Sequence, residues 1–305
     1  MAVLAKGRAL GFAACALASS LWGCGFFFGK IALREMNFAH MVLYRFLFAI
    51  VVLLPLLVKY RPGLGQREWG LLVLASFLGV PVQFLIQFYA LSITTVSHAA
   101  LMVGTMPVIL AVGATVFAHE RMDRVGWMAL AGSTCGAGLI ALGGGGHAKG
   151  GATLAGDLLV VVSLLIALNW ILINKKLMAR HSHLVVTAYG LGIGTAMLMV
   201  WVPLRYGMPP VVGVSTKAWL ALAGSGVLCT AATTLLWNWG MTQVPASQAG
   251  VLLNMEPLMG SLLGVLVLRE RLGPSAWVGG GLILASAVTL TTRSKTRVRE
   301  QLPLT

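Results

Sequence analysis

Long apolar stretches dominate this sequence and restrict the folds that are open to it. Each is about 18–22 residues long, which is enough to cross the hydrocarbon core of a bilayer as a helix. The ten stretches are about 9–29, 38–58, 69–90, 96–117, 125–143, 157–174, 183–203, 218–240, 246–267 and 275–292. Helices satisfy every backbone group within such runs, and the alternating pattern of a membrane β-barrel is absent. The sequence therefore predicts an all-α integral membrane protein with ten transmembrane helices.

Composition supports a lipid environment. Of the 305 residues, 58% are hydrophobic and 10% are charged, whereas soluble domains carry about 25% charged residues. The net charge is +14, but the basic residues stand in short runs between apolar stretches. We therefore expect contacts with lipid headgroups and no nucleic acid partner. The cysteines lie in apolar runs without metal-ligand spacing, so we expect free thiols that pack as small residues and no metal site. No cofactor is expected either.

An internal repeat gives the predicted helices an order. Residues 97–134 align with residues 247–284 without a gap, at a constant offset of 150, and six aligned pairs are identical. The chain therefore reads as one five-helix unit written twice. Because five is odd, the second copy enters the membrane from the opposite face. Two inverted five-helix repeats are typical of secondary transporters, which alternate access by rocking one half against the other.

The repeat and the charge pattern predict the domains and the orientation. We expect a first repeat over 1–145, a glycine-rich linker over 146–155, a second repeat over 156–292 and a basic tail over 293–305. With the N-terminus inside, the inner loops hold fourteen Lys and Arg residues and the outer loops hold seven. This bias predicts that both termini are cytoplasmic.

Three ionisable residues fall inside the predicted spans, where each costs about 2.5–3.5 kcal/mol at the bilayer centre. Arg45 is expected to be a structural anchor that reaches a carboxylate, a carbonyl or a headgroup. Glu256 is either a protonated or hydrogen-bonded carboxyl that stabilises a broken helix, or a substrate amine contact or proton site. His98 is either a packed neutral side chain or part of a cavity.

Two further pairs occupy equivalent positions in the repeats. Pro107 and Pro257 each remove a backbone donor in mid-span, so we expect broken helices whose freed polar backbone can line a cavity. Glu120 and Glu270 lie at the ends of equivalent helices. We expect each to clamp a neighbouring helix, as a gate on its own face of the membrane.

Helical spacing extends the candidate cavity. Amides and aromatic rings recur at one helix face in several of the predicted spans. The full candidate set is Trp22, Phe26, Gln83, Gln87, His98, Met102, Thr105, Asn169, Trp170, Asn174, Trp237, Asn254 and Glu256. Such a lining suits a small zwitterionic or amphipathic solute. The alternative is that these groups form interhelical hydrogen bonds and interfacial aromatic belts.

Three segments resemble the EamA domain of the drug/metabolite transporter superfamily. The segment LWGCGFFFGKIALREMNFAHMVLYRFLFA (21–49) is similar to the start of such a domain, and 156–176 is similar to a second start. The segment NMEPLMGSLLGVLVLRERLGPSAWVGGGLILASAVTL (254–290) is similar to its end. The resemblance implies ten helices, an inner-membrane address and export of small metabolites. Departures such as Ala188 opposite Arg45 and Met106 opposite Glu256 make the two halves chemically unequal.

These observations predict a secondary transporter of the bacterial inner membrane that exports amino acids or related metabolites. A sugar-phosphate, nucleotide-sugar or drug carrier of the same fold is the alternative. A membrane-embedded enzyme is less favoured because no paired acids, HExxH or GxSxG motif falls in the spans, and a channel is less favoured because no ring motif is visible. Uniport and proton antiport stay open, as does the oligomeric state.

Overall fold

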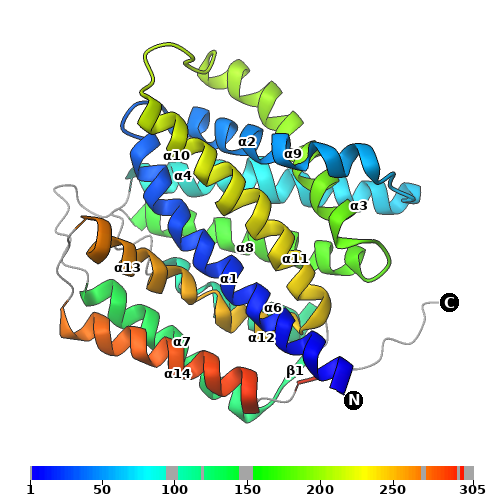
Figure 1. The fold of residues 1–305 in the computed structure, drawn as a ribbon, viewed down its shortest axis with the longest axis vertical. Helices are drawn as coiled ribbons and strands as arrows, with labels where there is room; N and C mark the ends of the chain where they lie inside the picture. Colours follow the sequence, from blue (N-terminus) through cyan, green and yellow to red (C-terminus); the bar gives the residue numbers. More distant parts are fainter. Residues whose placement is uncertain are drawn as a thin grey trace.

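The computed structural model describes residues 2–93, 102–117, 120–143, 154–268, 273–293 and 296–298. Helices make up almost all of this part of the chain (Figure 1). In the first half they are α1 (Ala2–Ala32), α2 (Phe38–Lys59), α3 (Gln66–Phe77), η1 (Leu78–Val82), α4 (Gln83–Ile93), α6 (Met106–Phe117) and α7 (Arg124–Gly143). In the second half they are α8 (Leu154–Met178), α9 (His183–Tyr206), α10 (Thr216–Gly226), η2 (Val227–Ala232), α11 (Thr233–Gln243), α12 (Ala246–Leu252), α13 (Met255–Leu268) and α14 (Pro274–Arg293).

The helices have the length and surface of membrane spans. Within the described residues, six helical runs are long and apolar enough to cross a bilayer, three in each half of the chain. Large apolar side chains point outward from them; Val58 and Leu204, for example, are 81% and 80% exposed. Water would oppose such a surface, whereas lipid tails would cover it. The protein is therefore a multi-pass helical membrane protein, and the total of ten crossings stays a prediction.

Helix packing follows one pattern in both halves. Helix α1 packs along α10, η2 and α11, and α8 packs in the same way along α3, η1 and α4. Helix α2 contacts α10 and η2, while α9 contacts α3 and η1. Two helices also pack against their own counterparts in the other half, α2 against α9 and α7 against α14. Helices α7 and α14 run side by side along the lower edge of Figure 1. Each half therefore packs mainly against the other half.

Four interruptions divide the long helices. The π-helical turns η1 and η2 connect α3 to α4 and α10 to α11. Pro81 lies within η1 and cannot donate an α-helical hydrogen bond, which accounts for the change of register there. Turns at residues 104–105 and 253–254 precede α6 and α13. Pro107 and Pro257 follow directly, in the first turn of each helix, where a missing N–H leaves no partner unsatisfied.

A short ladder ties the tail to the first half. Strand β1 (Glu120–Met122) pairs antiparallel with β2 (Thr296–Val298), with Glu120 opposite Val298. These residues belong to no helix, and the pairing supplies partners for their backbone groups. Apart from this ladder, the described regular structure is helical.

Glu120 of β1 is a buried contact between the two halves. Its carboxylate accepts hydrogen bonds from the Lys175 Nζ at 2.7 Å, from the Ala246 and Ser247 backbone N–H groups at 3.0 and 2.8 Å, and from the Ser247 hydroxyl at 2.8 Å. Ala246 and Ser247 begin α12, so the carboxylate caps that helix and meets its positive end. Burial alone would raise the pKa of Glu120. The Lys175 charge and the backbone donors outweigh burial and hold the pKa below its usual value.

Glu120→Gln is expected to lower the stability by about 2 kcal/mol, because it removes the charge that Lys175 and the helix terminus face. Thermal unfolding in detergent would measure the loss. Since the folded-state pKa of Glu120 is lowered, its contribution is present above the unfolded pKa and disappears as pH falls through the folded value. The difference in stability between wild type and variant should therefore disappear at acidic pH.

The matched control is Glu68→Gln, which removes a carboxylate that pairs with His181 and Arg180 at the end of α8. We expect a much smaller loss there, because this carboxylate and its partners are only partly buried and ion pairs near the surface contribute little. Equal effects of the two substitutions at neutral pH would show that the buried Glu120 contacts stabilise the fold no more than a partly exposed ion pair does.

Candidate functional site

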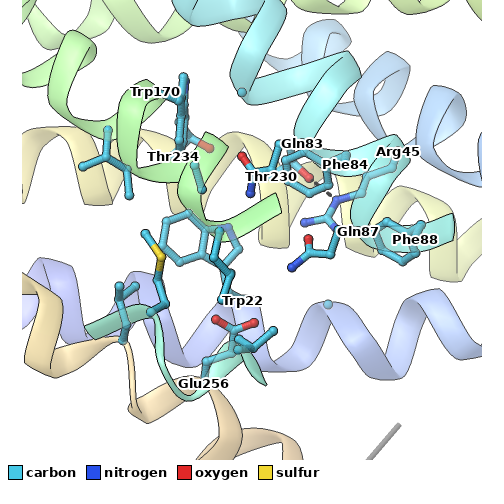
Figure 2. Close-up of a pocket in the computed structure, with 18 of the residues that line it drawn as sticks. Trp22, Arg45, Gln83, Phe84, Gln87, Phe88, Trp170, Thr230, Thr234 and Glu256 are labelled. Atoms are coloured by element: carbon cyan, nitrogen blue, oxygen red, sulfur yellow. Dashed lines mark hydrogen bonds between the residues drawn. The ribbon is translucent and has the colours of Figure 1, made fainter. Parts of the chain in front are cut away.

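A cavity of about 110 Å³ lies between the two halves (Figure 2). Both halves supply its lining, and both π-helical turns reach it, through Gly79 of η1 and Thr230 of η2. The polar part of the lining consists of Arg45, Gln83, Gln87, Thr230, Thr234 and Glu256. The aromatic part consists of Trp22, Phe46, Phe84, Phe88 and Trp170.

Arg45 is the buried cation of this lining. It comes from α2 and is 5% exposed. Its Nε donates to the Thr230 Oγ1 at 2.6 Å, and its Nη2 donates to the Cys229 carbonyl at 2.8 Å. The guanidinium also lies over the Phe84 ring, 5.2 Å from the centroid. The expectation of an anchor that reaches a carbonyl agrees with the Cys229 contact, but the same side chain also faces the cavity.

Local structure explains why Arg45 can be held there. A side chain at Gly226 would collide with the Arg45 carbonyl, so glycine lets α10 approach α2 closely at this level. The π-helical turn η2 follows at once and presents the Cys229 carbonyl to the guanidinium. The Thr230 hydroxyl also donates to the Ser225 carbonyl at 3.0 Å, so it bridges the helix and the arginine.

Glu256 is the carboxylate of the lining. It lies in the first turn of α13, directly after the turn at residues 253–254. The backbone N–H groups of a first turn point toward such a carboxylate and favour its negative charge. A side chain at Gly23 would collide with the Glu256 carbonyl, so α1 passes this turn closely. In the described part of the chain, the carboxylate has no hydrogen bond or ion pair, and it faces the cavity.

The two glutamines of the lining come from α4. Gln83 is 9% exposed, and its Oε1 has no hydrogen-bond partner among the described residues. Gln87 lies one turn further along and forms no side-chain hydrogen bond within the described chain. Figure 2 shows its amide in the region between Arg45 and Glu256. Buried polar groups of this kind usually have partners, so these amides are available to a solute or to water.

Aromatic rings enclose the rest of the cavity. The Trp170 indole packs on η1 at Gly79, where any side chain would collide with the ring. The Trp22 ring packs at a tilt against the Trp237 ring, with 5.3 Å between the centroids. Trp237 is 1% exposed and does not line the cavity itself, so it supports Trp22 from behind.

Of the residues predicted from sequence as a cavity set, Trp22, Gln83, Gln87, Trp170 and Glu256 line the cavity. Arg45, predicted as an anchor, lines it as well. His98 and Glu270 lie outside the described residues, and so does the side chain of Phe26.

The other predicted cavity residues form contacts elsewhere. The Asn254 amide donates to the Ser133 Oγ at 2.9 Å, which connects the turn before α13 to helix α7. Asn174 is an exception, because it is 4% exposed and its Oδ1 has no hydrogen-bond partner among the described residues. Asn169 is exposed and donates to the Leu165 carbonyl of its own helix. The Thr105 hydroxyl donates to the Met102 carbonyl at 2.6 Å, within the turn before α6.

Sequence reasoning missed part of the lining. Phe84 and Phe88 are one position after Gln83 and Gln87, so the same one-turn spacing could have found them. Thr230 and Thr234 are also one turn apart and line the cavity. The offset of 150 instead pairs Gln83 with Thr233, which is fully buried. Their contribution depends on the π-helical turn, which the sequence pattern does not reveal.

Comparison with known proteins agrees with this architecture. An uncharacterized transporter of Archaeoglobus fulgidus is 27% identical over 281 residues, which is 91% of this chain and 95% of the relative. A probable terminal-alkyne amino-acid exporter of Streptantibioticus cattleyicolor is 27% identical over 208 residues, 66% of each chain. A chain in a solved crystal structure shares the fold, with a TM-score of 0.77 at 18% identity over 94% of this chain and 98% of that one.

The EamA-like transporter family matches this sequence twice, over residues 9–142 and 154–292. The two matches cover nearly all of the described helices, from α1 to α14. The helical membrane architecture and the cavity between the halves are consistent with this match. The chain belongs to the EamA-like transporter family.

Proposed function

We propose that this transporter exports amino acids or closely related small metabolites across the inner membrane by alternating access. The observation that carries the proposal is the cavity between the halves, where unpaired amides and a carboxylate lie among aromatic rings. A solute held there contacts both halves at once. Movement of one half against the other then changes the side to which the solute is exposed.

An inverted repeat of ten spans underlies this cycle. The repeated family match and the recurring packing pattern support two units, with α1 corresponding to α8, α2 to α9 and α7 to α14. The boundaries follow as proposed from sequence, at 1–145, 146–155, 156–292 and 293–305. The excess of basic residues on one side favours cytoplasmic termini.

Glu120 is the proposed gate at the cytoplasmic end. It belongs to the first half and holds Lys175 and the start of α12 in the second half. These contacts must break for the halves to separate at that end. Glu270, at the equivalent sequence position, is the proposed counterpart on the opposite face.

The size of the cavity favours amino acids over larger solutes. A dry engineered cavity of about 150 Å³ holds one benzene molecule, so a cavity of about 110 Å³ suits a solute of only a few heavy atoms. A nucleotide sugar is far larger. A sugar phosphate also needs several cations, and Arg45 is the sole Lys or Arg in the described lining. The relative described as a probable amino-acid exporter points to the same class.

Proteoliposomes that contain the purified protein are expected to accelerate counterflow of one or more L-amino acids over empty liposomes. A panel of amino acids, sugar phosphates and organic cations would be measured in parallel. Acceleration of sugar phosphates or cations alone would replace the proposed substrate class. No acceleration of any member of the panel would contradict the proposed function.

Trp170→Ala is expected to reduce this transport about tenfold or more, because it removes a ring that encloses the solute and rests on Gly79. Trp201→Ala is the matched control, because Trp201 is 53% exposed on α9 and outside the lining. Initial counterflow rates at equal amounts of folded protein would compare the two. Similar rates for both variants would remove Trp170 from the site.

A further inference from the structure

The cavity presents one fixed cation and one fixed carboxylate to any solute that enters it. We propose that the site selects zwitterions: Arg45 binds the carboxylate of an α-amino acid and Glu256 binds its ammonium group. This assignment rests on the proposed transport function and names the feature that the substrate must have. It makes Arg45 a binding residue as well as the anchor that its protein contacts indicate.

Arg45 keeps donors available for a carboxylate. A guanidinium has five N–H groups, and two of them engage Thr230 and the Cys229 carbonyl. The first contact fixes Nε and the second fixes one hydrogen of Nη2, so Nη1 and the second hydrogen of Nη2 stay free in the described chain. Gly25 faces this end of the guanidinium, and a Cβ there would lie 3.8 Å from both terminal nitrogens. Glycine therefore leaves room for a ligand beside the donor group.

Glu256 is the complementary acceptor. Its carboxylate lines the same cavity, and no described donor contacts it. No ion pair within 4.0 Å joins it to Arg45 in the described part of the chain, although the two opposite charges attract each other across the cavity. Figure 2 shows Arg45 entering from α2 and Glu256 entering from below, with Gln87 in the region between them.

Opposite charges on two sides of a cavity discriminate by repulsion as well as by attraction. A solute with only a carboxylate satisfies Arg45 but brings a second negative charge near Glu256. A solute with only an ammonium group satisfies Glu256 but brings a second positive charge near Arg45. A zwitterion satisfies both groups, and in this low-dielectric setting each mismatch costs more than it would in water.

The rest of the lining fits an uncharged side chain on that zwitterion. Gln83 and Gln87 offer amides to the polar end, and Trp22, Phe84 and Trp170 surround the remainder. With about 110 Å³ available, the structure assigns the site to α-amino acids with small apolar side chains.

Three ligands that differ by one charged group test this directly. Wild-type protein in nanodiscs would be titrated with L-alanine, with ethanamine, which lacks the carboxylate, and with propanoate, which lacks the ammonium group. Tryptophan fluorescence reports binding, because Trp22 and Trp170 line the cavity. We expect alanine to bind about tenfold or more tightly than either analogue, since each analogue lacks one charge-assisted contact. The other L-amino acids would be titrated in the same way, to include side chains that fit better.

Two variants test the two charged groups of the ligand one at a time. Glu256→Gln should abolish the preference for the amino acid over the acid that lacks the ammonium group, and should keep the preference over the amine. Arg45→Gln should abolish the preference over the amine and keep the preference over the acid. Controls are Glu68→Gln and Arg205→Gln, which remove surface charges outside the lining. If Arg45→Gln does not fold, the wild-type comparison and Glu256→Gln still decide the outcome.

Equal affinities of wild type for amino acid, amine and acid would overturn the assignment, and so would binding of an amine or an acid alone. Transport of such a solute would leave the proposed transport function intact, so failure of the two proposals can be distinguished. A general loss of binding in both variants, without an exchange of preference, would assign Arg45 and Glu256 a structural role only.

Discussion

Every backbone N–H and C=O group in the hydrocarbon core must find its partner within the protein. Most of this chain meets that constraint as uninterrupted α-helix, and the exceptions are therefore informative. The two π-helical turns contribute Gly79 and Thr230 to the cavity, and the turn at residues 253–254 immediately precedes α13, whose second residue is Glu256. The irregular backbone thus lies beside the cavity, where side chains, a neighbouring helix or a solute can satisfy the backbone N–H and C=O groups that have no helical partner.

Buried charge is arranged by the same logic. Arg45 is held by a hydroxyl and a carbonyl from the other half, and Glu120 is held by an ammonium group and the start of a helix from the other half. Both are contacts between the halves, one at the cavity and one at an end of the molecule. Contacts of this kind link solute binding to the relative position of the halves, because a rearrangement changes the environment of a charge that lipid cannot solvate.

Much of the fold is predictable from the sequence because two periodic signals agree. Apolar stretches of spanning length indicate the helices, and the offset of 150 pairs Pro107 with Pro257 and Glu120 with Glu270. The partners of Glu120 were not predictable, because Lys175, Ala246 and Ser247 come together only when α8 and α12 pack at β1.

The candidate site was predictable only in part, for a physical reason. Gln87 and Trp170 could be inferred because a polar or aromatic group inside an apolar run is unusual. Asn169, the neighbour of Trp170, carries the same signal but turns outward and bonds to its own helix. One residue rotates a helix by about 100°, so the choice between neighbours depends on packing that sequence spacing does not encode.

The central claim is that two halves of opposite orientation enclose the cavity. Arg124 and Pro274 begin the equivalent helices α7 and α14, 150 positions apart, and both are exposed. Cysteines placed singly at these positions in a background without native cysteines would be labelled with a membrane-impermeant maleimide in oriented vesicles. The account predicts that residue 124 reacts from the cytoplasmic side and residue 274 from the opposite side. Labelling of both from one side would contradict it.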